Sequence, residues 1–121
     1  MTDYQAPVRQ MRFTIDHLAD FQAVAALPDF SAVDSDTIEA VLGEAARFAG
    51  SVLAPINWLG DQQGVKVIDD AVQVPREFTD AYKQFCESGW NGVTLPADFG
   101  GQGLPDVMGA AVKEMTMSAN M

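Results

Sequence analysis

Residues 87 to 111 read ESGWNGVTLPADFGGQGLPDVMGAA and join two segments whose apolar residues follow helical spacing. Five glycines and two prolines lie between residues 89 and 105. Glycine adopts positive φ angles without strain and proline fixes its own φ angle, so the composition predicts a sharp, rigid turn between helices. We expect five apolar residues to pin this turn onto the core: Trp90, Val93, Leu95, Phe99 and Leu104.

A glycine-rich segment before a helix also raises the question of phosphate binding. The dinucleotide fingerprint G-x-G-x-x-G begins at Gly101 and Gly103, but Asp106 stands at the third glycine position. A Walker A loop requires a lysine, and none lies nearby. Asp106 would also repel a phosphate placed at the start of the next helix. The pattern therefore favours a structural turn.

The segments on either side of the turn predict helices and one hairpin. Pro75 suits the first turn of a helix that ends near Gly89, and Pro105 suits the first position of the last helix. Valines alternate around Asp69 and Asp70 as in a two-stranded hairpin, which must pack against something because a lone hairpin is marginally stable.

The N-terminal half predicts two further helices. One runs over residues 36 to 53, where Ser35 or Asp36 is a candidate cap, Asp36 and Glu39 resemble a capping box, and Pro55 is a stop signal. The other runs over residues 14 to 27, preceded by an irregular or extended arm over residues 1 to 13. The predicted fold is mainly α, with four or five helices and one small β-hairpin.

The composition excludes several classes of function. The net charge of −10 opposes binding to nucleic acid or to anionic lipid. Cys86 is the single cysteine, so neither an internal disulfide nor a structural zinc site is expected, and a reducing cytoplasm is the natural compartment. The apolar runs are too short to cross a membrane.

No residue stands out as a catalytic group or a metal ligand. Cys86 is interpreted as an inert, partly buried thiol and His17 as a residue at a helix end. The acids in DSD and DD are typical of a helix cap and a turn. The methionines of the last segment are expected to fill the core or an interface: Met108, Met115, Met117 and Met121.

The segment GWNGVTLPADFGGQGLPDVMGAAVKEMTMSANM resembles the N-terminal helical domain of the acyl-CoA dehydrogenase family of flavoenzymes. The family pattern is G-W-x-G followed by P-x-x-[FY]-G-G-x-G. The residues that match it are Gly89, Trp90, Gly92, Pro96, Phe99, Gly100, Gly101 and Gly103. YQAPVRQMRF and EAARFAGSVLAPINWLGDQQG resemble the branch that includes methylmercaptopropionyl-CoA dehydrogenase and related bacterial long-chain enzymes.

The resemblance implies an enzyme in which a carboxylate removes the α proton of an acyl-CoA while the β hydride passes to FAD. The electrons then leave for an external acceptor. Members of the family carry a flavin-binding β-domain and a helical bundle with the catalytic base after this region. We therefore expect an N-terminal fragment that has no catalytic or cofactor-binding residue of its own and is inactive alone. Residues 1–33 would form the extension arm and first helix, and residues 34–121 the helical domain, incomplete at its C-terminus.

A second hypothesis is a stand-alone acidic helical interaction module without catalysis. Its supporting feature is the methionine-rich last helix, whose apolar face would lack a cover in a chain of this length. Self-association of the isolated chain is also expected, because a domain that evolved as part of a larger protein exposes former interdomain surface.

Overall fold

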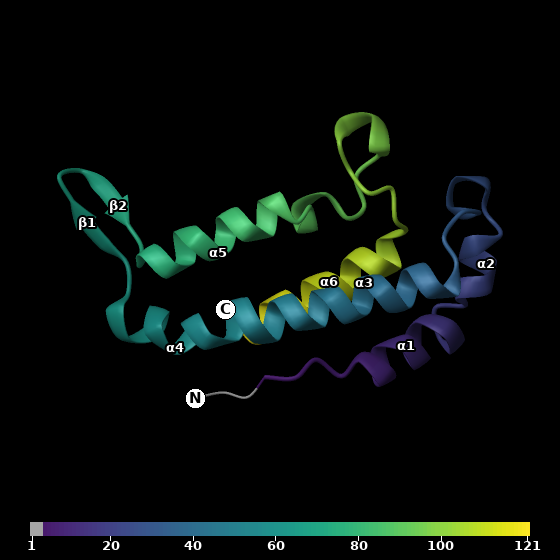
Figure 1. Ribbon diagram of the computed structural model, residues 1–121, viewed down its shortest axis with the longest axis horizontal. Coiled ribbons are helices and arrows are strands. Elements are labelled where there is room, and N and C mark those ends of the chain that lie inside the picture. The colour runs from purple at the N-terminus through teal and green to yellow at the C-terminus, as the bar shows by residue number, and fades with distance from the viewer. Residues whose placement is uncertain (1–3) are drawn as a thin grey trace.

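The computed structural model describes residues 4–121, which form a mainly helical fold with one β-hairpin, as predicted (Figure 1). The helices and strands, in chain order, are α1 Val8–His17, α2 Phe21–Ala25, α3 Ser35–Phe48, α4 Ala54–Gln63, β1 Lys66–Ile68, β2 Ala71–Gln73, α5 Arg76–Glu87 and α6 Asp106–Ala119.

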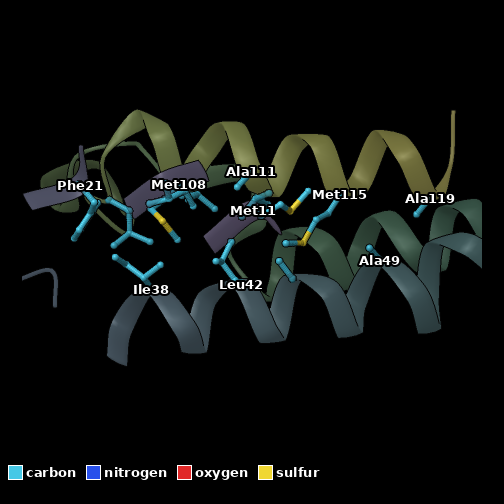
Figure 2. Packing of buried hydrophobic residues seen from close by; sticks show 14 of the residues in the cluster. Met11, Phe21, Ile38, Leu42, Ala49, Met108, Ala111, Met115 and Ala119 are labelled. Atoms are coloured by element: carbon cyan, nitrogen blue, oxygen red, sulfur yellow. The ribbon is translucent and has the colours of Figure 1, made fainter. Parts of the chain in front are cut away.

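The core lies between α3 and α6, which pack side by side (Figure 2). Four large side chains at their interface are fully buried: Ile38, Leu42, Met108 and Met115. The spacing of four residues on α3 and of seven residues on α6 places each pair on one face of its helix. Helices α1 and α2 close one end of this core with Met11, Ile15 and Phe21.

The prediction for the N-terminal region is wrong in its boundaries. Part of the expected arm is helical, because α1 begins at Val8, directly after Pro7. The expected helix over residues 14 to 27 is broken after His17, where Asp20 adopts a φ of 48° and its carboxylate accepts a hydrogen bond from the Ala23 amide. Residues 1–3 of the expected arm lie outside the described residues.

Helix α3 is capped one residue earlier than predicted. Asp34 is the N-cap, and its Oδ1 accepts hydrogen bonds from the Thr37 amide at 2.8 Å and the Thr37 hydroxyl at 2.7 Å. The first bond satisfies one of the free amides at the helix start, which is the role that the sequence assigned to Ser35 or Asp36. The predicted capping box is therefore wrong.

Pro55 does not stop the helix, contrary to the prediction. A π-helical turn over Ala49–Leu53 connects α3 directly to α4, and Pro55 occupies the first turn of α4. A proline is tolerated in the first turn of a helix because an amide hydrogen there would not make a hydrogen bond within that helix. The wider π turn accommodates the proline ring. The Leu53 carbonyl accepts a hydrogen bond of 2.9 Å from Asn120 Nδ2, which ties the end of α6 to this turn.

The hairpin has the predicted turn, but it does not have the predicted packing against another part of the described chain. Strands β1 and β2 pair antiparallel with Val67 opposite Val72, and Asp69 and Asp70 both have positive φ angles. Every strand residue is exposed, and Figure 1 shows the hairpin projecting beyond α4 and α5. Within the described part of the chain, the expected packing partner of the hairpin is therefore missing.

Candidate functional site

The glycine loop, defined as residues 89–104, is a closed turn rather than an open cradle. Its two arms are joined by three backbone hydrogen bonds. Gln102 N donates to Gly92 O at 2.8 Å, Leu104 N to Val93 O at 3.0 Å and Gly103 N to Leu95 O at 2.9 Å. The Gln102 side chain adds a bond of 2.9 Å from Nε2 to Gly89 O at the mouth of the loop.

The glycines of the loop meet two different requirements. Gly89, Gly100 and Gly103 have φ angles of 76°, 80° and 64°, a region that strains other residues. Gly101 has no positive φ, which corrects the expectation for this position. A Cβ at residue 101 would instead lie 2.0 Å from Leu95 O, so close approach of the two arms requires glycine there.

The loop is pinned to the core by fewer apolar residues than predicted. Val93 and Leu104 are buried, and half-buried Trp90 lies with its ring centroid 6.3 Å from that of Phe48. Leu95 and Phe99 are exposed, Phe99 by 83%, which contradicts the expectation that they pin the loop. Leu95 precedes Pro96, and Phe99 is the last residue of the short 3-10 turn Ala97–Phe99 that follows Pro96.

The hydrogen bonds of the loop leave its amides unsuited to phosphate. The amides of residues 101 to 104 all donate to carbonyls inside the loop, Gly101 N to Pro96 O at 3.1 Å. Phosphate sites of glycine loops depend on amides that point outward and are not already used. Asp106 begins α6 beside the loop and adds a negative charge.

A hollow of about 460 Å³ lies between the end of α5, the glycine loop and α6. Thr94 reaches over α6 here, since a Cβ at Gly109 would lie 2.5 Å from Thr94 Cγ2. The hollow contains one acid and one base, Asp106 and Lys113, and its other lining residues are uncharged. A cysteine and a histidine are not among its lining residues.

A second hollow, which we call the apolar groove, lies between α4, α5 and α6 and has a volume of about 280 Å³. It has no charged residue: its lining is Leu53, Ile56, Phe78, Ala81, Tyr82, Phe85, Thr116, Met117 and Asn120. The predicted apolar face of α5 therefore borders an open groove, with Tyr82 and Met117 exposed. A hydrogen bond with Cys86 raises the pKa of the Tyr82 hydroxyl.

Within residues 4–121 the titratable groups do not form a catalytic pair. Hydrogen bonds with Thr37 lower the pKa of Asp34, and the hydrogen bond with Arg47 lowers the pKa of Glu44. Cys86 is half-buried on α5, and His17 lies in the last turn of α1 against the ring of Phe13. Among residues 4–121 we found no group of three metal-ligating side chains.

Comparison with known proteins adds a family to this geometry. The family model for the acyl-CoA dehydrogenase N-terminal domain matches residues 35–121, which is more than half of the chain. The chain belongs to the acyl-CoA dehydrogenase family. The match contains the glycine loop, the hollow beside it and the apolar groove.

Two curated members of the acyl-CoA dehydrogenase family are similar over nearly the whole chain. The chain is 42% identical to 3-methylmercaptopropionyl-CoA dehydrogenase of Ruegeria pomeroyi over 118 residues, and this matched region covers 98% of the chain. It is 28% identical to the broad-specificity linear acyl-CoA dehydrogenase FadE5 of Mycobacterium tuberculosis over 123 residues, and this matched region covers 99% of the chain. In each case the chain spans 20% of the relative's length.

The structure also shows contacts of this acyl-CoA dehydrogenase domain that the sequence analysis missed. Gln102 closes the loop through its side chain, and Thr94 fixes the distance between the loop and α6. Gly109 was an available signal, because a glycine inside a helix often marks close approach of another segment. Asn120 gave no signal, since its partner Leu53 lies far away in sequence. None of the described helices has the length and apolar character needed to span a membrane.

Proposed function

We propose that the chain is the N-terminal part of an FAD-dependent acyl-CoA dehydrogenase, which desaturates acyl-CoA thioesters, and that it is inactive alone. The observation that carries the proposal is the 42% identity to the Ruegeria enzyme over 98% of the chain, although only 20% of that enzyme is matched. Acyl-CoA and an electron acceptor are then the partners of the complete protein, in fatty-acid or related acyl-CoA catabolism.

The chemistry of desaturation supports the inactivity of the isolated chain. A general base near neutral pH is expected to have a raised pKa if it is a carboxylate. Among residues 4–121, the two carboxylates with shifted pKa values, Asp34 and Glu44, are exposed and their pKa values are lowered. The base would therefore come from another part of the complete enzyme.

The residues of this chain do not by themselves fit a flavin site. The amides of the glycine loop that would face a pyrophosphate donate within the loop instead. We propose FAD for the complete enzyme, and no bound cofactor for this chain alone. The eight family-pattern residues would then serve to build the turn, within a division of the chain into residues 1–33 and 34–121. The family match beginning at residue 35 supports that division.

Absorption spectroscopy tests both halves of the proposal. The purified 121-residue chain is expected to lack a flavin absorption band and to remain unchanged when an acyl-CoA is added. A hybrid protein, in which the chain replaces the matching 118 residues of the Ruegeria enzyme, is expected to bind flavin and to be bleached by acyl-CoA. Flavin reduction by the short chain, or a folded hybrid that holds no flavin, would contradict the proposal.

The second candidate function is the stand-alone interaction module. The uncovered apolar groove favours it, because exposed apolar surface of this kind is suited to a protein partner. Reading the gene beyond the Met121 codon separates the two functions. A frame that continues into flavin-domain sequence supports the dehydrogenase, whereas a stop codon there supports the module. In either function we propose self-association of the isolated chain, and the cytoplasmic location remains a prediction from its single cysteine.

A further inference from the structure

The hairpin presents an apolar face that no described part of the chain covers. Paired residues on antiparallel strands point to the same side, so Val67 and Val72 share one face of the hairpin. Val65 and Val74 continue the same alternation just outside the strands. We call these four residues the valine face. Val67 and Val72 are 72% and 71% exposed.

The base of the valine face opens into a hollow of about 520 Å³ between α4, the hairpin and α5. Val65 and Val74 line this hollow together with Trp58 and Phe78, and Trp58 is 67% exposed. The last residues of the chain, Asn120 and Met121, line it as well. The valine face and the hollow therefore form one continuous surface at the end of the molecule that Figure 1 shows to be occupied by the hairpin.

A two-stranded hairpin with an uncovered face is marginally stable in water. An exposed apolar patch such as the valine face usually marks a contact with another domain or chain. We propose that the valine face and its adjoining hollow dock against the remaining four-fifths of an acyl-CoA dehydrogenase. This inference rests on the proposed function, and it assigns a contact surface that the proposed function leaves open.

Two observations favour this partner over a second copy of the chain. First, both relatives carry four-fifths of their length outside the matched segment, so a large further body of protein is available in each. Second, the chain has a net charge of −10, so electrostatic repulsion opposes the pairing of two copies.

Hydrogen exchange of residues 64–75 tests the proposal in the hybrid protein described above. In the isolated 121-residue chain the amides of the hairpin are expected to exchange rapidly. In the hybrid these amides are expected to exchange more slowly by a factor of at least about ten, because docking suppresses local opening. The same segment of the unmodified Ruegeria enzyme gives a second measurement that does not depend on folding of the hybrid.

A pair of lysine substitutions adds a matched control. Val72→Lys places a charge on the valine face, and Ala71→Lys places the same charge on the opposite face of the same strand, where its partner Ile68 is uncharged. Both are expected to leave the thermal midpoint of the isolated chain nearly unchanged, since both side chains are exposed there. In the hybrid, Val72→Lys is expected to restore rapid hairpin exchange and lower the thermal midpoint, and Ala71→Lys is expected to do neither.

Three outcomes would overturn the inference. The first is rapid hairpin exchange in both the flavin-loaded hybrid and the unmodified relative. The second is an equal effect of the two lysine substitutions in the hybrid. The third is a self-associated chain that loses its association with Val72→Lys while the hybrid is unaffected, which would assign the surface to a second copy. A hybrid without flavin would count against the proposed function, and the exchange of the relative would still decide the docking surface.

Discussion

At the scale of single residues, Gly101 is the position where the glycine loop tolerates least change. The Leu95 carbonyl approaches so closely that a Cβ would lie 2.0 Å from its oxygen, and the same oxygen accepts the Gly103 amide hydrogen. A side chain at residue 101 would therefore push the two arms apart and break a bond of the loop. The constraint comes from backbone, which cannot rotate away as a flexible side chain can.

We expect Gly101→Ala to lower the free energy of unfolding by about 3 kcal/mol, because backbone must move to relieve the overlap. Gly43→Ala is the matched control: residue 43 lies exposed inside α3, and a Cβ there would meet no atom within 4 Å. The control should raise the free energy of unfolding by about 0.5 to 1 kcal/mol. Urea unfolding followed by circular dichroism measures both, and equal midpoints for the two variants would contradict the prediction.

Asp34 leads to a prediction on pH. Hydrogen bonds with Thr37 lower its pKa in the folded state, so the stabilisation by its charge is fully present above the unfolded pKa near 4. That stabilisation is lost as the pH falls through the lower folded pKa. The drop in thermal midpoint caused by Asp34→Ala should therefore be largest at pH 7 and shrink progressively below about pH 4.

Thermal melts of the parent chain and Asp34→Ala across this pH range measure the difference. Asp36→Ala is the control, because the carboxylate that bonds Thr37 belongs to Asp34. A difference that stayed constant, or grew in acid, would show that the charge of Asp34 does not contribute through the cap.

Residue roles could be predicted from the sequence where they are local. Gly89, Gly100 and Gly103 are needed for their positive φ angles. The glycine-rich composition of the loop indicates such angles directly. The role of Gly101 depends on how the loop folds back on itself, and the exposure of Phe99 depends on which way the loop's outer end points. Neither property leaves a periodic signal in the sequence.

At the scale of elements, the hairpin turn is held by two aspartates with positive φ angles. A two-residue turn of this kind prefers Asn-Gly or Asp-Gly, because glycine adopts positive φ without strain. An Asp-Asp turn is therefore less stable than an Asp-Gly turn would be at the same place.

Asp70→Gly is expected to stabilise the hairpin by about 1 kcal/mol, because it removes the strain of an L-residue in the left-handed region. Hydrogen exchange of residues 66 to 73 in the isolated chain measures the change. Asp70→Ala removes the same charge and keeps the strained conformation, so it should not slow exchange. Equal slowing by both variants would attribute the effect to charge instead.

Element boundaries were harder to predict than element types. Apolar spacing identified the helical faces around Leu42, Phe78 and Met108. It did not reveal the break at Asp20 or the continuation through Pro55. A proline that stops a helix and a proline in a first helical turn look alike in sequence, because both lack the amide hydrogen.

At the scale of the whole molecule, charge and apolar surface oppose each other. The chain has seventeen acids against seven bases, and it also exposes the apolar groove and the valine face. The first property keeps copies of the chain apart, whereas the second draws them together. Salt changes the balance because it screens the repulsion.

We therefore expect self-association of the isolated chain to increase with ionic strength. The Debye length falls from about 30 Å at 0.01 M salt to about 3 Å at 1 M, so repulsion between copies is nearly removed. Light scattering at a fixed, high protein concentration should report a larger mean mass at 1 M than at 0.01 M. A monomer at both salt concentrations would contradict the prediction, and a mass that fell with salt would indicate ionic contacts.

The π turn at Ala49–Leu53 has a consequence for the orientation of everything that follows it. Each residue added to an α-helix rotates the next side chain by about 100° around the axis. A π turn contains an extra residue between hydrogen-bonded partners, so it resets the angular phase of the helix. Helix α3, the π turn and α4 form one nearly continuous helix. Its apolar side therefore faces α6 along α3, and it faces α5 along α4. Removing one residue from this turn would swing α4 and the hairpin around the axis of α3 while leaving each segment helical.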